Sequence, residues 1–373
     1  MALSKISNDM FTTNTLQPRN KPIIYNGNQS VAQRSTSSTG ISAGGYYTVD
    51  RWTFSMANTA GRLTSAQIAD GPAGTGLVNC TKLTCTTADT SIASNEVLQF
   101  QQKLEGQDIQ EFCKGTSDAK KFTVAFYVKG NASATYTCEL HDRDNTRYNG
   151  QEFAVTTSWN RIVLVFDADT TGAFDDDNAV SLSLNFNLHG GSDYTGGTFS
   201  SNTWHTTANQ RFGDNQTSFF DSTDRTFFIT GIQMEVGEFT ASSLPPFQHE
   251  SYGDNLLRCY RYYYKLIPST GFRYAGWGQV DNDDEVILGI TWFKIHMRAA
   301  PSALEQSGTA SHYKVREATT TTCDAVPTFT NADTWYAATS FKKDGITSSN
   351  GYAQGEPLKV GIDGGYLAWS AEL

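Results

Sequence analysis

The run Val180-Ser-Leu-Ser-Leu-Asn-Phe-Asn-Leu-His189 alternates apolar and polar side chains without a break. Successive side chains of an extended strand point to opposite faces of a sheet, so this run predicts a half-buried strand. The apolar face would pack onto a core, while the Ser, Asn and His face would lie outside it.

The same alternation recurs along the chain from Tyr46 onward, and clusters of Gly, Asn, Asp and Ser separate the runs. Such clusters are typical of turns, and almost no run has a helical period. Many short strands joined by polar turns predict an all-β chain built of sandwiches. Further alternating runs lie at residues 98–104, 122–128, 134–140, 162–166, 228–236, 286–292 and 358–362.

The Tyr-rich stretch Ser251–Lys265 reads SYGDNLLRCYRYYYK and follows Pro245-Pro246, which ends the preceding strand. Its apolar residues first recur at helical spacing, so we expect a short helix that leads into a strand near residues 262–266. This joint divides the chain into a β-sandwich over residues 45–250, the joint over 251–265, and a second, smaller β-sandwich over 266–373.

The joint carries more aromatic side chains than a two-faced strand hides without partners. Aromatic residues favour the cores of interfaces, so these side chains either contact another subunit or fill the crease between the two domains. The residues concerned are Tyr260, Tyr262, Tyr263 and Tyr264.

Residues 1–44 are rich in Ser, Thr, Asn, Gln and Gly, and one apolar patch, Pro22–Tyr25, interrupts them. A stretch of this composition buries no core by itself. It is either a flexible terminus or an extended N-terminal arm that becomes ordered on a partner subunit.

The chain has 373 residues, a net charge of −10 and 12% aromatic residues. It has no basic cluster larger than a Lys pair, so nucleic acid is excluded as an expected partner. No apolar run approaches the length of a membrane span. The six cysteines lack zinc-ligand spacing, and we interpret them as buried thiols of a protein made in a reducing cytosol.

Motifs of catalysis are missing from the sequence: there is no Gly-rich phosphate loop and no G-x-S-x-G elbow. The six histidines are scattered, and no pair has helical metal-ligand spacing. Spacing does not exclude a Ser-His-Asp triad, because triads assemble in space. We nevertheless expect a protein that is not an enzyme and requires no cofactor.

Two clusters of acidic residues fall in predicted turns, at Asp175-Asp176-Asp177 and at residues 281–285. A catalytic acid needs an apolar pocket to raise its pKa, and these clusters are surrounded by polar residues. They are either solvated turns or, for Asp175, Asp176 and Asp177, a weak candidate for calcium, which prefers oxygen ligands on loops.

Carbohydrate binding is the chemistry that the aromatic loops favour, because sugar sites combine an aromatic plate with carboxylates or amides. The alternative is that the Trp side chains have a structural role and pack at an edge of their sandwich or in a subunit interface. The candidates are Asp193, Tyr194, Trp204 and His205 in the first domain, and Asp333, Trp335 and Tyr336 in the second.

Several stretches, in this order, resemble the jelly-roll, carbohydrate-binding-module-like domain of tailed-bacteriophage virion proteins. The resemblance covers about residues 40–265 and continues into a C-terminal β domain. It is carried by Asp50-Arg51-Trp52, Leu104-Glu105-Gly106, Phe122–Lys129, Trp159, Ile229–Gly237, Pro246–His249, the joint, Met297–Pro301 and Gly365–Leu373.

This resemblance implies a structural protein of the virion, assembled in the host cytoplasm as a homotrimer and mounted on capsid, tail or adaptor proteins through its N-terminal region. The first residues do not look like the long anchor of the best-known podovirus tail fibres, which leaves a head decoration, head fibre or short tail appendage. The alternatives are an adhesin that binds host surface polysaccharide and, further off, a polysaccharide depolymerase.

Overall fold

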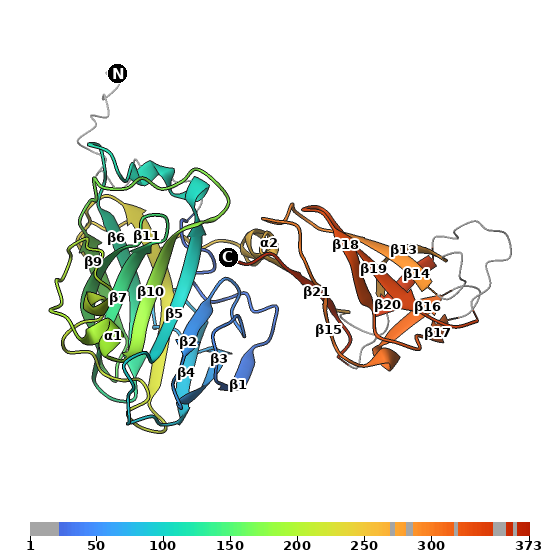
Figure 1. Ribbon diagram of the computed structural model, residues 1–373, viewed down its shortest axis with the longest axis horizontal. Helices are drawn as coiled ribbons and strands as arrows, with labels where there is room; N and C mark the ends of the chain where they lie inside the picture. The colour runs from blue at the N-terminus through green and yellow to red at the C-terminus, as the bar shows by residue number, and fades with distance from the viewer. Residues whose placement is uncertain (1–21, 269–272, 281–285, 317–319, 346–355, 361–363) are drawn as a thin grey trace, which may run out of the picture. The chain divides into compact units, whose positions relative to one another are not determined.

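The protein is described by a computed structural model, which covers residues 22–268, 273–280, 286–316, 320–345, 356–360 and 364–373. The chain divides into two compact units, Met1–Tyr252 and Gly253–Leu373 (Figure 1). Nearly all regular structure is β, which confirms the predicted all-β class. None of the helices in the described residues has the length and apolar character that a membrane crossing requires.

The first unit contains a six-stranded antiparallel sheet with the strand order β1-β3-β4-β11-β6-β9 (Figure 1). Its strands are β1 (Ser37–Ile41), β3 (Arg62–Ile68), β4 (Cys80–Thr87), β6 (Phe122–Gly130), β9 (Asn160–Phe166) and β11 (Thr226–Val236).

A second antiparallel sheet of this unit has five strands in the order β2-β5-β10-β7-β8. Most neighbours within each sheet are distant in the sequence, as in a jelly roll. The strands are β2 (Thr53–Ala57), β5 (Val97–Glu105), β7 (Ala134–Asp142), β8 (Arg147–Val155) and β10 (Val180–Gly190), and the connections hold the short helices η3 (Gly106–Asp108), η4 (Gln110–Phe112), α1 (Ser192–Thr195) and η5 (Ala208–Gln210).

The core of the first unit lies between the apolar faces of the two sheets. Phe186 of β10 is paired in register with Phe100 of β5, and both are buried. Phe126 of β6 in the other sheet meets the Phe186 ring edge-on, with ring centroids 4.9 Å apart. Burying one such side chain contributes about 1.5–3 kcal/mol to stability. The apolar residues of β10 therefore determine which face of the strand packs against the other sheet.

Residues 22–44 are part of this folded unit, so the predicted arm over residues 1–44 is wrong for them; residues 1–21 lie outside the described residues. Ile23, Ile24 and Val31 are at most 3% exposed. Strand β1 pairs with β3 and forms the edge of the six-stranded sheet. The polar composition misled the prediction because polar side chains here bond to backbone.

Asn26 shows how this polar segment is held. Its side-chain amide donates to the carbonyls of Val31 and Asp50, at 2.9 and 3.0 Å, and its oxygen accepts from the N–H groups of Ser30 and Val31. A Cβ atom at Gly27 would lie 2.1 Å from the carbonyl oxygen of Ile232, so only glycine lets the segment approach β11 this closely.

At one end of the first unit, carboxylate and carbonyl oxygens surround the buried ammonium group of Lys114. We name this arrangement the Lys114 cage. The Nζ atom of Lys114 donates to Asp142 Oδ2 at 2.5 Å and to the carbonyls of Thr171 and Gly172 at 2.9 and 2.7 Å. Asp169 Oδ2 lies 3.1 Å from the same Nζ, and the Lys114 side chain is fully buried. The ammonium therefore pairs with Asp142 and, together with Arg147, with Asp169, and it satisfies two carbonyls, as a buried charge requires.

In its described residues, the second unit combines helical turns with two antiparallel sheets, ordered β12-β21-β15 and β17-β16-β20-β13-β14-β19-β18. Helix α2 (Tyr252–Tyr260) begins at the unit boundary and leads into β12, as the sequence of the joint predicts. The strands are β12 (Tyr263–Leu266), β13 (Arg273–Val280), β14 (Val286–Trp292), β15 (Glu305–Gln306), β16 (Tyr313–Arg316), β17 (Thr320–Thr322), β18 (Thr328–Ala332), β19 (Tyr336–Lys342), β20 (Glu356–Val360) and β21 (Leu367–Ser370), with the short helix η6 (Ala310–His312).

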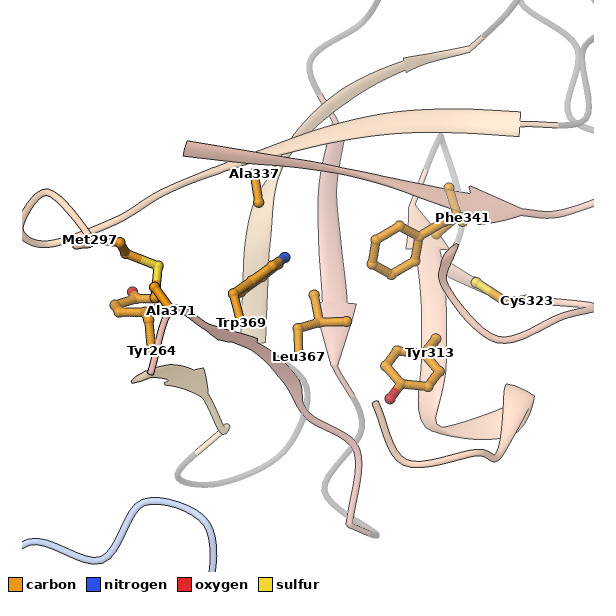
Figure 2. Packing of buried hydrophobic residues seen from close by; sticks show 10 residues of the cluster. Tyr264, Met297, Tyr313, Cys323, Ala337, Phe341, Leu367, Trp369 and Ala371 are labelled. Atoms are coloured by element: carbon orange, nitrogen blue, oxygen red, sulfur yellow. The ribbon is translucent and has the colours of Figure 1, made fainter. Parts of the chain in front are cut away.

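Figure 2 shows the core of the second unit, which gathers residues from both of its sheets. Trp369 of β21 is fully buried and packs near Tyr264 of β12, with ring centroids 6.2 Å apart. All six cysteines of the chain lie in described residues and are free thiols; five are buried and Cys113 is half-buried.

Three tyrosines of the joint are buried within the chain, which corrects the subunit interface predicted for Tyr262, Tyr263 and Tyr264; Tyr260 is half-buried, and an interface at this residue stays a prediction. Tyr262, Tyr263 and Tyr264 are at most 4% exposed within the single chain. Tyr264 belongs to the core of the second unit and Tyr260 packs against that core. The apolar surface of the three buried tyrosines is covered by the fold itself.

Candidate functional site

Three aromatic side chains gather on the outer face of the seven-stranded sheet in the second unit. Trp292 and Trp335 are 56% and 43% exposed, and their ring centroids lie 4.8 Å apart. Tyr336 lies 5.9 Å from Trp292 and 5.4 Å from Trp335. We name Trp292, Trp335 and Tyr336 the aromatic platform.

Strand register brings the platform together. Trp292 at the end of β14 is paired with Tyr336 at the start of β19, and the Phe293 N–H donates to the Trp335 carbonyl at 3.0 Å. Ala337 and Phe341 of β19 point into the core, so Tyr336, one residue before Ala337, points outward. The paired strands β14 and β19 therefore hold Trp292 and Tyr336, while Trp335 lies in the bend that immediately precedes β19.

A shallow pocket of about 250 Å³ adjoins the platform. Its wall combines apolar area with an exposed amide, Asn331, and a hydroxyl, that of Thr330, which bonds to Ser340 at 2.9 Å. Flat rings beside a few hydrogen-bonding groups suit a ligand with an apolar face and hydroxyl edges. The lining residues are Ile290, Trp292, Thr330, Asn331, Tyr336 and Ala338.

The candidates Asp333, Trp335 and Tyr336 thus divide into two groups. Trp335 and Tyr336 belong to the platform, whereas Asp333 stabilises the turn between β18 and β19. Its carboxylate accepts from the Thr334 N–H at 2.5 Å, and its own N–H donates to the Tyr336 carbonyl at 2.9 Å. Sequence reasoning missed Trp292, because the alternation over residues 286–292 placed it on the apolar face that was expected to be buried, whereas Ile290 and Trp292 are exposed.

The candidates of the first unit do not form a comparable plate. Tyr194 stacks on Phe212 at 5.3 Å, and the Trp204 indole N–H donates to the Asp167 carbonyl at 2.7 Å. His205 forms a backbone bridge with Tyr148, and burial lowers the pKa of its imidazole. Asp193 lies exposed in α1. Each of the three rings is tied to its own neighbour, and Trp204 faces the Lys114 ammonium at 5.2 Å.

Residues 191–218, the cover segment, hide the polar face of the five-stranded sheet. Ser183, Asn185, Asn187 and His189 of β10 are at most 1% exposed, so both faces of this strand are buried. The Gln216 amide of the cover segment donates to the Asn187 carbonyl at 2.7 Å. The polar face expected outside the core therefore forms a second, hydrogen-bonded interior.

A buried ion pair fixes the cover segment in place. Arg211 donates from Nε and from a terminal nitrogen to the two carboxylate oxygens of Glu139, each at 2.8 Å. Burial raises the pKa of Glu139, but the charge and hydrogen bonds of Arg211 outweigh it and hold the pKa below its usual value. The Arg211 guanidinium also lies over the Tyr148 ring, at 4.4 Å.

The acidic cluster Asp175, Asp176 and Asp177 is exposed, and the Asp177 carboxylate caps the Ala179 N–H at 2.8 Å. In the part of the chain that the structure describes, no group of three or more His, Cys, Asp or Glu side chains is placed to hold a metal ion. Calcium binding at these residues stays a prediction, and residues 281–285 lie outside the described residues.

Comparisons with solved structures find low-identity likenesses to β-sandwich modules. A family 4 carbohydrate-binding module has 11% identity and a TM-score of 0.32, covering 57% of this chain and 99% of that one. The enzymatically active domain of tailspike protein 4 from bacteriophage CBA120 also has 11% identity and a TM-score of 0.32, covering 58% of this chain and 21% of that one. A family 11 carbohydrate-binding module of a Clostridium thermocellum cellulase has 12% identity and a TM-score of 0.28, covering 54% and 99%.

No family model and no curated protein matches the chain. Because the TM-scores quoted all lie below 0.5, what these proteins bind or cleave is not carried over to this chain.

Proposed function

We propose that the chain is a carbohydrate-binding surface protein that recognises bacterial polysaccharide through the aromatic platform of its second unit. The observation that carries this proposal is the exposure of Trp292 and Trp335 side by side on a sheet face. Large exposed aromatic groups of this kind mark binding surfaces, because leaving them in water has no benefit for folding.

Sugar rings fit this surface better than flat apolar ligands do. A pyranose presents C–H groups on one face, which pack against an indole, and hydroxyls at its edge, which need amide or hydroxyl partners. The platform supplies the indoles, while Asn331 and Thr330 supply the polar partners at the pocket wall. The proposed role of the platform is binding without catalysis.

The setting that we propose is the virion of a tailed phage, where the chain would act as a head decoration, head fibre or tail appendage. The resemblance in sequence order over residues 40–265 supports this setting, as does the pairing of that domain with a second β domain. A homotrimer attached to other virion proteins is part of the same proposal.

Substitution within the platform tests the binding role. Trp292→Ala and Trp335→Ala should each weaken binding to an array of bacterial surface polysaccharides about tenfold or more, since one lost stacking contact is worth about 1–2 kcal/mol. Tyr252→Ala is the matched control, because Tyr252 is an equally exposed aromatic residue outside the platform. Unchanged binding by a folded Trp292→Ala, Trp335→Ala double variant contradicts the proposal, as does a wild-type chain that binds no polysaccharide on the array.

A further inference from the structure

Three side chains that are far apart in the sequence meet at the end of β10. The Ser218 Oγ lies 2.8 Å from His189 Nδ1, and His189 Nε2 lies 2.9 Å from Glu96 Oε2. Ser218 ends the cover segment, His189 belongs to β10, and Glu96 immediately precedes β5. A serine, a histidine and a carboxylate in one hydrogen-bonded line are the arrangement of a nucleophilic relay.

The hydrogen bonds fix which ring nitrogen carries the proton. The Glu96 carboxylate only accepts hydrogen bonds, so His189 Nε2 carries the hydrogen and Nδ1 is left as the acceptor. The Ser218 hydroxyl therefore donates to Nδ1. The two ring nitrogens exchange the roles that they have in the familiar serine hydrolases, while the path of the proton from serine to imidazole is the same.

Burial separates the three residues into a shielded base and an accessible nucleophile. His189 is 0% exposed and Glu96 is 3% exposed, whereas Ser218 lines a pocket of about 320 Å³ that opens to solvent. Gly190 and Gly213 contribute backbone to the pocket wall, and Thr195 and Gln216 give it polar groups. A base that is kept from water behind an accessible hydroxyl is what acyl transfer to serine needs.

Neighbouring groups hold the hydrogen-bonded side chains of Ser218, His189 and Glu96 in place. The Phe220 N–H donates to Ser218 Oγ at 3.1 Å, and one oxygen lone pair is left free. The Phe220 ring packs edge-on against the imidazole of His189, with centroids 5.2 Å apart. Glu96 Oε1 accepts from the Ala93 N–H at 2.7 Å, so the carboxylate is fixed at both of its oxygens.

We infer that Ser218, His189 and Glu96 form a hydrolytic site for carboxylic esters with a small acyl group. Ser218 Oγ attacks the ester carbonyl as its proton passes to His189 Nδ1. The tetrahedral intermediate expels the alcohol, which takes that proton, and leaves an acyl-serine. Water then attacks the acyl group with His189 as base, which releases the carboxylic acid and returns the proton to Ser218. Glu96 is a positioning residue that holds the imidazole tautomer and stabilises the imidazolium.

Covalent labelling of the full chain tests the site directly. An alkyl fluorophosphonate should add one phosphonyl group to Ser218, located by mass spectrometry of peptides, with loss of fluoride. Ser218→Ala should abolish that label, whereas the exposed Ser222→Ala is the matched control and should keep it. A folded wild-type chain that leaves Ser218 unlabelled overturns the inference.

Hydrolysis of 4-nitrophenyl acetate gives the second readout, measured in a Cys113→Ser background to remove the half-buried thiol. His189→Asn should slow it about 100-fold or more. Glu96→Gln should lower kcat and leave KM unchanged, because the amide no longer holds the imidazole tautomer that accepts the serine proton; a residue that only supports the fold would not separate these two constants.

Equal rates in Ser218→Ala and wild type contradict the inference. Labelling of Ser218 reports on this site alone, whereas polysaccharide binding reports on the aromatic platform, so the two proposals stand or fall separately.

Discussion

The aromatic platform of the second unit and the covered sheet face of the first unit both depart from the usual pattern of burial. Aromatic side chains are exposed in the platform, whereas polar side chains are buried in the covered face. Trp292 lies in water at 56% exposure, while Asn185 and Asn187 are at most 1% exposed. Groups such as the Glu139–Arg211 pair hydrogen-bond part of the covered face internally. The contrast teaches that polarity alone does not locate a binding surface here: the chain itself covers most of the polar face, and the apolar platform is left exposed.

The largest expected effect concerns the polar N-terminal segment. Deleting residues 1–40 should unfold the first unit, because burial of Ile23, Ile24 and Val31 contributes about 1.5–3 kcal/mol each against a total stability of about 5–15 kcal/mol. Deleting residues 1–21 should preserve the thermal unfolding transition.

The shorter deletion also tests the proposed virion attachment. If residues 1–21 anchor the chain, particles assembled with this variant should lack it, as measured by the protein composition of purified particles. Normal incorporation of the shorter deletion would show that the anchor lies elsewhere.

Breaking the ion pair under the cover segment should cost about 3–5 kcal/mol. Arg211→Met removes the guanidinium and leaves the fully buried Glu139 carboxylate without its charge partner. The measurement is urea unfolding of the full chain, in which the unfolding transition of the first unit is monitored. Arg161→Met, on a half-buried arginine of the other sheet, is the control. An equal loss of unfolding free energy in both variants would mean that the buried ion pair contributes no more than an ordinary arginine contact.

Acid should destabilise the covered face before it affects the platform. Burial lowers the pKa of His141 to about 3, with Arg211 and Arg143 acting in the same direction and Glu139 opposing them. The folded pKa lies below the unfolded value of about 6.5, so this stability is complete above pH 6.5 and is lost as the pH falls toward 3. The loss is about 2 kcal/mol at pH 5.

Replacement of His141 by a neutral residue isolates this contribution. His141→Gln should flatten the fall in unfolding free energy between pH 6.5 and 4, measured by chemical denaturation at each pH. An unchanged slope would show that other groups carry the acid sensitivity.

The smallest effect on stability should come from the platform. Trp292→Ala should change the free energy of unfolding of the second unit by less than about 1 kcal/mol, because over half of the side chain is already in water. By contrast, Trp369→Ala in the core should cost about 3–5 kcal/mol. A large loss for Trp292→Ala would mean that the platform is a structural element.

Local patterns predicted much of the fold. The alternation over residues 180–189 matches β10, and the joint gives α2 followed by β12, because side-chain period and helix spacing are local properties. Residues 22–44 and the cover segment escaped prediction, since Asn26 and Arg211 are satisfied by partners that are distant in the sequence. The same limit applies to Ser218, His189 and Glu96, whose approach depends on how three separate segments meet.

The Lys114 cage has a consequence for the conditions under which the first unit stays folded. An oxygen cage filled by a dissolved ion is stabilised only in proportion to the logarithm of that ion's concentration, and chelation empties it. In Lys114 the cation is covalently attached to the chain, so dilution and chelators leave its local concentration unchanged. The stability that the Lys114 cage contributes is therefore independent of any dissolved cation.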